Sequence, residues 1–245
     1  MDHRHLWGTE VAKRYDTPGV GMFAPEVLEP TIDVLAKYAE GGRVLELGIG
    51  TGRVAVPLSQ RGVPVAGIDI SAAMVEQLRT KVSEDVLPVV VGDMATTRVA
   101  GEFSLVFCVY NTISNLLSQQ EQVECFKNAA RHLRPGGRFI VELWVPELRK
   151  LVPGEKTVIF RSEPNYIGYD TYDVVDQRVV STHITFGKDR TPRVFETPQR
   201  YIWPAEMDLM AQLAGFRLEA RYADWHGNPF TAESRSHISV YRLEP

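Results

Sequence analysis

Short apolar runs alternate with helically spaced apolar residues through the middle of the chain. The runs predict strands at Arg43–Leu47, Val63–Ile68, Leu87–Val91, Phe103–Val109 and Gly137–Trp144. The spacing between them predicts helices at Arg53–Gln60, Ala72–Val82 and Gln119–Leu133. Such alternation is typical of a parallel sheet covered by helices. Since strand–helix–strand units are right-handed, the strand carboxyl ends meet at one edge, and we expect function in the loops there.

After Trp144 the pattern changes to alternating β-branched and aromatic segments. These predict an antiparallel β insertion after the fifth strand, at Thr157–Ser162, Tyr166–Phe186 and Arg193–Ile202, with a turn at 187–189. The chain then returns with a helix and two last strands, at Ala205–Ala214, Phe216–Ala223 and Ser236–Leu243. Because the insertion leaves the sheet at its carboxyl edge, we expect it to form a roof or wall beside the crevice.

Charge and cysteine content exclude several classes of protein. The 245 residues include 27 Lys and Arg against 31 Asp and Glu, a net charge of −4, which argues against nucleic-acid or anionic-membrane partners. Cys108 and Cys125 lie in apolar stretches and offer neither a disulfide framework nor a cysteine-ligated metal site. Met1–Glu10 carries charges and histidines where a signal peptide would be apolar, so a cytoplasmic location is expected.

The first predicted strand runs directly into three alternating glycines, Gly48, Gly50 and Gly52, and then into a helix. Glycines at a helix N-terminus let the backbone approach a ligand closely. A dinucleotide fingerprint has G-x-G-x-x-G, but Arg53 occupies the sixth position, and the G-K-[ST] of a Walker loop is absent. Asp69 ends the second strand, 21 positions after Gly48.

In order and spacing, the residues from Arg43 to Trp144 resemble the class I methyltransferases that use S-adenosylmethionine and release S-adenosylhomocysteine. The resemblance implies that Glu46 lies near the methionine portion of the cofactor, beside the glycine loop. It also implies that Asp69 holds the ribose hydroxyls, with Ile70 and Met74 as further cofactor contacts. A carboxylate is suited to this because it can accept hydrogen bonds from two vicinal hydroxyls.

Two later motifs extend the resemblance toward the other parts of the cofactor. Asp93 and Met94, after the third strand, match the residues that bind the adenine amino group and pack on the ring. Tyr110 and Asn111, after the fourth strand, fall where the family lines the sulfonium region. The alternatives are a helix-dipole role for Glu46, core packing for Met94 and an Asx turn at Asn111.

The N-terminal region resembles the lid of the small-molecule branch of this family, which occurs in natural-product pathways. There a Tyr-Asp pair covers the cofactor, which corresponds to Tyr15 and Asp16, ahead of a helix predicted at Pro25–Ala39. Anchoring of a mobile arm is the alternative role for Tyr15. The branch often covers its acceptor with an inserted sheet, which in some sugar-amine dimethyltransferases helps to form a dimer, so a homodimer is an expectation here.

The chain is therefore expected to adopt an α/β, Rossmann-like methyltransferase fold with seven core strands, the last one antiparallel. Its expected parts are a lid and helix at 1–40, a cofactor-binding core at 41–149, an insertion over the acceptor at 150–203, and a part completing the core sheet at 204–245.

The chemistry of the acceptor is less constrained by the sequence. The Asn-Pro-Pro-Tyr motif of base amine methyltransferases and the Pro-Cys motif of cytosine-C5 enzymes are both missing, which favours a small-molecule acceptor and leaves a peptide terminus open. Candidate acceptor contacts are Asn115, Tyr169, Asp170, Arg200 and Trp203, and candidate catalytic residues are Tyr15, His183 and His226. Along an extended strand, Tyr166, Asp170 and Tyr172 share one face, and Tyr169, Asp173 and His183 are expected on the other.

Several functions stay open at this point. Methylation of an amine nitrogen is slightly favoured, while methylation of a hydroxyl would need a histidine base. An NAD-dependent oxidoreductase and a non-catalytic domain that binds S-adenosylmethionine are the alternatives from other classes. The spacing of Asp170, Asp173 and Asp176 indicates a solvated edge, and no metal site is expected.

Overall fold

A computed structural model describes residues 6–187 and 189–244. Half of the charged segment Met1–Glu10 and one residue of the predicted turn at 187–189 lie outside the described residues. Within them, no helix is both long enough and apolar enough to span a membrane.

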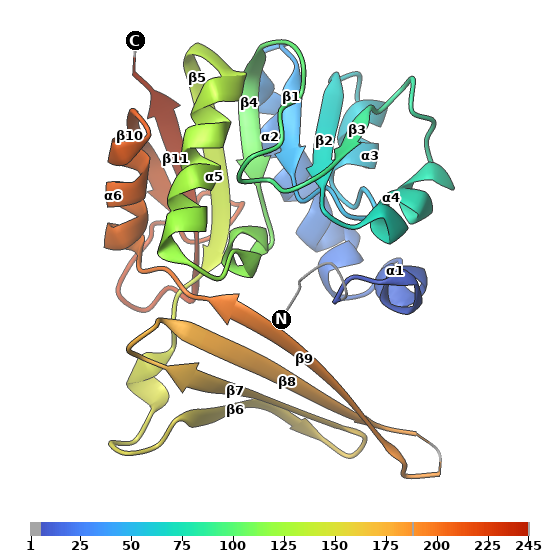
Figure 1. The fold of residues 1–245 in the computed structure, drawn as a ribbon, viewed down its shortest axis with the longest axis vertical. Helices are drawn as coiled ribbons and strands as arrows, with labels where there is room; N and C mark the ends of the chain where they lie inside the picture. The colour runs from blue at the N-terminus through green and yellow to red at the C-terminus, as the bar shows by residue number, and fades with distance from the viewer. Residues whose placement is uncertain (1–5, 188, 245) are drawn as a thin grey trace.

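The core is a mixed sheet with the strand order β10-β11-β5-β4-β1-β2-β3 (Figure 1). Its strands are β1 (Val44–Leu47), β2 (Val65–Asp69), β3 (Val89–Val91), β4 (Phe103–Cys108), β5 (Leu133–Trp144), β10 (Phe216–Tyr222) and β11 (Ser236–Leu243). β1 to β5 pair in parallel, whereas β11 runs antiparallel to both β5 and β10. This confirms the predicted seven-stranded sheet with an antiparallel last strand.

Helices cover both faces of the core sheet. α5 (Gln119–His132) and α6 (Pro204–Leu213) pack on one face, which Figure 1 shows in front. α2 (Pro25–Ala39), α3 (Ala55–Gln60) and α4 (Ala72–Arg79) contribute to the core cluster on the other face. Burial on both faces explains why the central strands read as continuous apolar runs. A capping box between Ser118 and Glu121 starts α5, in agreement with the helix predicted from Gln119.

The segment Arg134–Gly137 forms a turn-like irregularity at the start of β5, whereas the fifth strand is predicted to begin only at Gly137. β5 already begins at Leu133, and the pairing with β4 shifts from Phe103 opposite Leu133 to Leu105 opposite Arg138. Gly136 has φ +73°, a conformation that favours glycine. The turn residues therefore form an irregularity within the first part of the strand.

The insertion is a separate antiparallel sheet in the order β6-β7-β8-β9. Its strands are β6 (Thr157–Glu163), β7 (Tyr166–Asp173), β8 (Arg178–Phe186) and β9 (Pro192–Arg200). The single segment predicted at Tyr166–Phe186 is therefore two strands. They are separated by a turn in which the Asp173 carboxylate accepts the amides of Val175 and Asp176 at 2.9 and 3.3 Å. Figure 1 shows this sheet below the carboxyl edge of the core, with β9 nearest to the core.

Short helical segments flank the carboxyl edge of the core sheet. They are α1 (Thr9–Tyr15), η2 (Gly21–Phe23), η3 (Thr112–Asn115) and η4 (Leu148–Lys150). α1 packs against α4, and β9 packs against η3. The N-terminal segment, the post-β4 loop and the insertion thus converge on the carboxyl edge, where the sequence predicts function.

Candidate active site

The glycine loop after β1 has the conformation that its sequence requires. Gly48, Gly50 and Gly52 have φ values of +73°, +55° and +81°. A Cβ at Gly48 would lie 2.2 Å from Thr112 Cγ2, and one at Gly52 would lie 2.1 Å from Leu78 Cδ1. Side chains at these positions would therefore collide with the post-β4 loop and α4, and glycine keeps the loop close to both.

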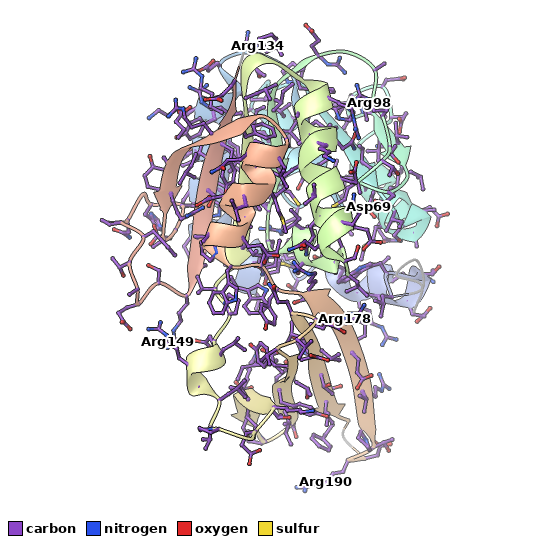
Figure 2. All side chains as sticks on the ribbon, turned by 60° about the vertical axis from the view of Figure 1, so that its left-hand side comes forward. Asp69, Arg98, Arg134, Arg149, Arg178 and Arg190 are labelled. Carbon is purple, nitrogen blue, oxygen red and sulfur yellow. The ribbon has the colours of Figure 1, made fainter. Side chains whose placement is uncertain are left out.

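Asp69 fastens this loop to the end of β2. Its Oδ2 accepts the Gly50 amide at 2.6 Å, and its Oδ1 accepts the Ser71 amide at 2.8 Å. Burial raises the pKa of Asp69, while these two amides act in the opposite direction. Figure 2 shows Asp69 in the part of the core near the insertion, whereas Arg134 lies at the far end. The carboxylate predicted to hold a ribose also holds the glycine loop.

Glu46 lies under the glycine loop at the end of β1. Its side chain is buried, and Oε2 has no hydrogen-bond partner within the described chain. Burial raises the pKa of Glu46 to about 8, although the nearby Arg53 charge lowers it. A buried carboxylate oxygen without a partner is costly, so a polar group of a ligand is the expected complement of Oε2.

The residues predicted to bind adenine follow β3. The Asp93 carboxylate accepts the Ala95 amide at 2.8 Å, and Met94 is buried in the core cluster under α5. At the start of α4, Met74 is buried and donates its amide to the Ser71 hydroxyl, beside the partly buried Ile70. Met94 therefore takes part in core packing as well as lying next to Asp93.

The post-β4 loop has two consecutive residues in the left-handed region, Tyr110 (φ +53°) and Asn111 (φ +64°). Non-glycine residues rarely adopt this conformation, and it concentrates at functional sites. Glu142 on β5 supports it, because its carboxylate accepts the Tyr110 amide at 2.7 Å and Trp225 Nε1 at 2.9 Å. Asn111 Oδ1 accepts the Trp144 amide at 2.8 Å, which joins the loop to β5.

The N-terminal segment closes one side of the crevice. The Tyr15 ring lies edge-on between Trp7 and Phe23, at centroid distances of 5.9 and 6.2 Å. Burial raises the pKa of Tyr15 to about 12, with the Arg53 charge opposing the rise. The hydroxyl is thus protonated at neutral pH. Next to it, the Asp16 carboxylate accepts the Thr51 hydroxyl at 2.5 Å, so the segment is tied to the glycine loop.

One face of the insertion looks toward this segment. Phe195 on β9 lies 6.4 Å from Trp7, and His183 on β8 stands opposite Phe195, with the two rings 6.2 Å apart. The prediction that His183 shares a face with Tyr169 is wrong. The register pairs His183 with Gly168, which places it beside Tyr166, whose hydroxyl lies 2.5 Å from His183 Nδ1.

Polar groups on this inner face mostly pair with one another. Asp170 accepts the Ser181 hydroxyl at 2.5 Å, and burial raises the pKa of its carboxyl. Burial lowers the pKa of His183, with the Asp170 charge opposing the decrease, so the imidazole is neutral near pH 7. Tyr169 lies on the opposite face of β7 and is not brought to the crevice.

The other predicted residues are more dispersed. Arg200 is buried and donates to Gln122 at 2.6 Å and Glu206 at 2.8 Å, which fastens β9 to α5 and α6. Asn115 donates to the Thr112 carbonyl within η3. His226 is exposed in the loop after β10, at the edge of the sheet away from β2 and β3. Its neighbour Trp225 donates to Glu142, which also accepts the Tyr110 amide, but His226 itself forms no side-chain hydrogen bond with another predicted residue in the described chain.

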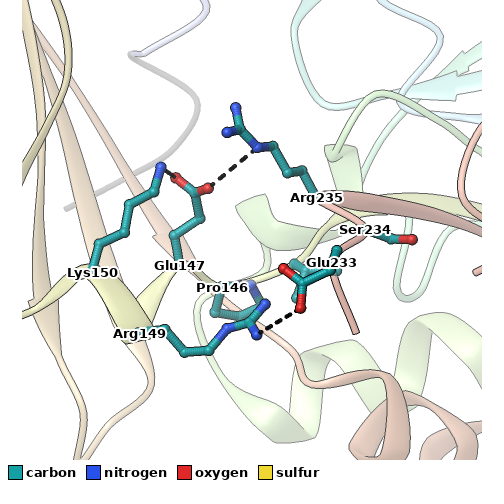
Figure 3. Close-up of a pocket in the computed structure, with 8 residues that line it drawn as sticks. Pro146, Glu147, Arg149, Lys150, Glu233, Ser234 and Arg235 are labelled. Carbon is teal, nitrogen blue, oxygen red and sulfur yellow. Dashed lines mark hydrogen bonds and ion pairs between the residues drawn. The ribbon is translucent and has the colours of Figure 1, made fainter. Parts of the chain in front are cut away.

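Trp203 lies in a surface cleft between the core and the insertion. An apolar part of about 440 Å³ is lined by Trp203, Phe230 and Pro146 among others. Figure 3 shows its charged continuation, where Glu147 pairs with Lys150 and Arg235, and Arg149 pairs with Glu233 at 3.7 Å. The charged side chains of this continuation therefore pair with one another.

With this geometry in place, comparisons with known proteins identify the family. Residues 44–137 match the family model described as a methyltransferase domain. The solved CcbJ methyltransferase of Streptomyces caelestis is 34% identical, with all of both chains covered and a TM-score of 0.87. The chain belongs to the S-adenosylmethionine-dependent methyltransferases.

Two curated relatives carry more specific names. The cypemycin N-terminal methyltransferase of a Streptomyces species is 27% identical over 231 residues, 91% of this chain and 89% of the relative. The dTDP-4-amino-2,3,4,6-tetradeoxy-D-glucose N,N-dimethyltransferase of Saccharopolyspora spinosa is 28% identical over 122 residues, 50% of this chain and 48% of that enzyme. This methyltransferase is similar to both enzymes.

The residues present fit S-adenosylmethionine. The glycine cradle has no room for side chains at Gly48 and Gly52, and Glu46 offers an unpartnered oxygen to a polar ligand group. Sequence reasoning missed Trp7 and Glu142, and treated Arg53 only as evidence against a dinucleotide. Trp7 and Glu142 act through contacts between segments far apart in the chain, so no local motif marks them. Of these three residues, only Arg53 could have been found from the sequence, because it directly follows Gly52 of the glycine loop.

Proposed function

We propose that this methyltransferase acts on an amine nitrogen of a small-molecule acceptor. The observation that carries the proposal is the placement of the histidines. His183 contacts Phe160, Tyr166 and Phe195 within the insertion, and His226 is exposed beyond β10. A hydroxyl acceptor needs a free base, and Nδ1 of His183 is engaged with the Tyr166 hydroxyl at 2.5 Å, whereas an amine needs only to be deprotonated before it attacks. The relatives named for a peptide terminus and an amino sugar support this choice.

The proposed chemistry is an in-line displacement. S-adenosylmethionine supplies a methyl group already activated on a sulfonium, so the chain mainly provides proximity and orientation. The amine lone pair forms the new C–N bond as the S–C bond breaks, and the resulting ammonium releases its proton to solvent. Tyr15 is a hydrogen-bond donor rather than a base, because its pKa of about 12 keeps it protonated. Tyr110 and Asn111, held by β5, line the transfer path.

The acceptor is proposed to lie between the N-terminal segment and the insertion. Trp7 and Phe195 form an aromatic edge there, and Asp170 adds a polar group on the same face. Aromatic faces attract apolar rings and cationic amines.

The test uses labelled S-adenosylmethionine with matched pairs of acceptors. A dipeptide with a free N-terminus and an aminodeoxy sugar are compared with their hydroxyl analogues. Methyl transfer is expected only to the amines, at a rate that rises with pH until the acceptor amine is fully deprotonated. His183→Ala and His226→Ala should retain most of the rate. Transfer to the hydroxyl analogues, lost in either histidine variant, would replace the proposal with an O-methyltransferase.

A further inference from the structure

The post-β4 loop has a backbone conformation that its own residues do not favour. Tyr110 and Asn111 are consecutive non-glycine residues in the left-handed region, which costs free energy and persists only where the surrounding structure holds it. The Tyr110 amide donates to Glu142 Oε2 at 2.7 Å, and the Asn111 amide donates to the Glu142 carbonyl at 3.2 Å. Asn111 Oδ1 in turn accepts the Trp144 amide at 2.8 Å. All three hydrogen bonds join the loop to β5, so the left-handed turn depends on this strand.

Two of these hydrogen bonds involve backbone groups of β5, whereas the Tyr110 amide binds a side chain that must itself be held. The second oxygen of Glu142, Oε1, accepts Trp225 Nε1 at 2.9 Å. An indole N–H is a donor only, so a carboxylate oxygen is a suitable partner for it. Trp225 is 9% exposed and packs in the core cluster on the face that α2 and α3 cover. The indole therefore fixes the rotation of the carboxylate that holds Tyr110.

The turn that carries Trp225 is closed by its own hydrogen bonds. Asp224 Oδ1 accepts the His226 and Asn228 amides at 2.9 and 3.3 Å, and Asp224 Oδ2 accepts Asn228 Nδ2 at 2.7 Å. A turn tied in this way places the indole without any contact from a ligand. The loop after β10 thus supports the post-β4 loop, although Trp225 and Tyr110 are 115 positions apart in the chain.

On its other side, the post-β4 loop borders the glycine loop. The Tyr110 ring centroid lies 4.9 Å from the Arg53 guanidinium, directly after the glycines. Thr112 lies so close to Gly48 that a Cβ there would be 2.2 Å from its Cγ2. A change in the turn at Tyr110 and Asn111 would therefore move residues that border the proposed transfer path.

We propose that Trp225 and Glu142 are positioning residues for methyl transfer: the indole orients the carboxylate, and the carboxylate holds the left-handed turn at Tyr110 in place. Both oxygens of Glu142 accept hydrogen bonds from the chain, so Glu142 acts through this turn and not as a base on the acceptor. In-line displacement depends steeply on alignment, and a misplacement of about 1 Å can lower a rate about 100-fold. The inference rests on the proposed function for the transfer path beside Tyr110, and on no particular amine.

Two single variants and their combination separate positioning from packing. Trp225→Phe removes the indole donor and keeps an aromatic ring. Glu142→Gln turns an NH₂ group toward one of the two donors, because a side-chain amide has only one acceptor oxygen. In the double variant the indole N–H is gone, so the amide oxygen is free to accept the Tyr110 amide. The double variant should therefore be more active than Glu142→Gln and no less active than Trp225→Phe, a non-additive result that independent packing defects would not give.

Two measurements follow these variants. With labelled S-adenosylmethionine and an amine acceptor, kcat should fall about 10- to 100-fold in Glu142→Gln and less in Trp225→Phe. The acceptor KM and the affinity for S-adenosylhomocysteine should change by less than about twofold, since an alignment effect belongs to the transition state. In protein labelled with ¹⁵N-tyrosine, exchange of the Tyr110 amide hydrogen should accelerate about 10-fold or more in Glu142→Gln and slow again in the double variant.

Glu219→Gln is the matched control. Glu219 is also a strand carboxylate, but it accepts Arg138 Nε at 3.0 Å, and Arg138 pairs further with Glu40 before the start of β1, at the opposite edge of the sheet. This variant should keep kcat and the exchange at Tyr110 unchanged.

Unchanged kcat in Glu142→Gln, or losses that multiply in the double variant, would show that Trp225 and Glu142 only stabilise the fold. Faster exchange at Tyr110 with unchanged kcat would equally overturn the positioning role. If the unmodified protein methylated no amine, the proposed function would fail instead. Unchanged exchange at Tyr110 in all variants would even then overturn the proposal, because Trp225 would not hold the turn through Glu142.

Discussion

Two charged residues beside the glycine loop, Glu46 and Arg53, differ in their hydrogen bonding from the polar residues on the inner face of the insertion. At the loop, Glu46 is buried with an unpartnered oxygen, and Arg53 has no carboxylate partner within the described chain. On the insertion, Tyr166 pairs with His183 and Ser181 pairs with Asp170. Unsatisfied groups prepare a site for a ligand of fixed chemistry, whereas satisfied pairs stabilise the sheet that carries them. We therefore expect the residues around the glycine loop to specify the cofactor closely, and the insertion to leave acceptor choice mainly to shape and aromatic surface.

The largest expected change in cofactor affinity follows from a substitution at Asp69. Asp69→Ala removes the acceptor of the Gly50 and Ser71 amides and the proposed partner of the ribose hydroxyls. We expect S-adenosylhomocysteine to bind more weakly by about 1.5–3 kcal/mol, the range for hydrogen bonds to charged groups. Calorimetric titration measures the change.

Asp173→Ala is a close control for that experiment. Asp173 also accepts two backbone amides, but in the β7–β8 turn. Both substitutions remove an acceptor of two backbone amides, so both should lower the free energy of unfolding to a similar extent. Asp173→Ala should, however, leave the affinity for S-adenosylhomocysteine unchanged. Equal cofactor affinity in Asp69→Ala and the unmodified protein would contradict the role of Asp69.

The two regions also differ in how far their structure could be predicted. The glycine loop, Asp69 and Asp93 belong to motifs contiguous in sequence, and the chain places each of them at the carboxyl edge as expected. In the insertion, the face of His183 was misjudged because the turn at 174–177 was not recognised. That turn pairs Asp173 with Arg178, so odd positions of β7 face even positions of β8, and His183 joins Tyr166.

Contacts between distant segments were beyond sequence reasoning for a different reason. Trp7 meets Phe195 across 188 positions of the chain, and Glu142 supports Tyr110 from another strand. No periodicity or spacing encodes such pairs, because they exist only once the sheet order and the position of the insertion are fixed. Arg200 shows the same limit: its residue type fitted acceptor binding, but burial against α5 and α6 gives it a structural partner.

A smaller effect is expected from the titration of Glu46. Burial raises its pKa in the free protein to about 8, so most molecules carry the neutral carboxyl at pH 7. A ligand ammonium favours the ionised form, so binding releases a proton and affinity rises with pH. Between pH 7 and 8 the ionised fraction, and with it the affinity for S-adenosylhomocysteine, should increase about fivefold. Titrations in two buffers of different ionisation enthalpy measure the proton released.

Glu46→Gln supplies the comparison for this pH dependence. The amide does not titrate, so its affinity should be nearly constant over the same range, after correction for the ligand. If the affinity of the unmodified protein for S-adenosylhomocysteine fell from pH 7 to 8, the change would be opposite to the expected one. Glu46 would then not bind the ligand ammonium. Because 5′-methylthioadenosine lacks the amine, its binding should show no proton release with either protein.

The smallest expected effect concerns the insertion and tests the other half of the comparison. Tyr166→Phe removes the hydroxyl that bonds His183 while keeping the ring. If the pair serves the sheet, the free energy of unfolding should fall by about 0.5–1.5 kcal/mol, the net value of one hydrogen bond, and cofactor affinity should not change. Urea unfolding and calorimetry on the same preparation measure both quantities. A variant with unchanged stability but a raised acceptor KM would instead give the Tyr166 hydroxyl a direct role in acceptor binding. The polar groups on this face of the insertion would then serve a ligand, as Glu46 and Arg53 are expected to do, and the two regions would not differ in this respect.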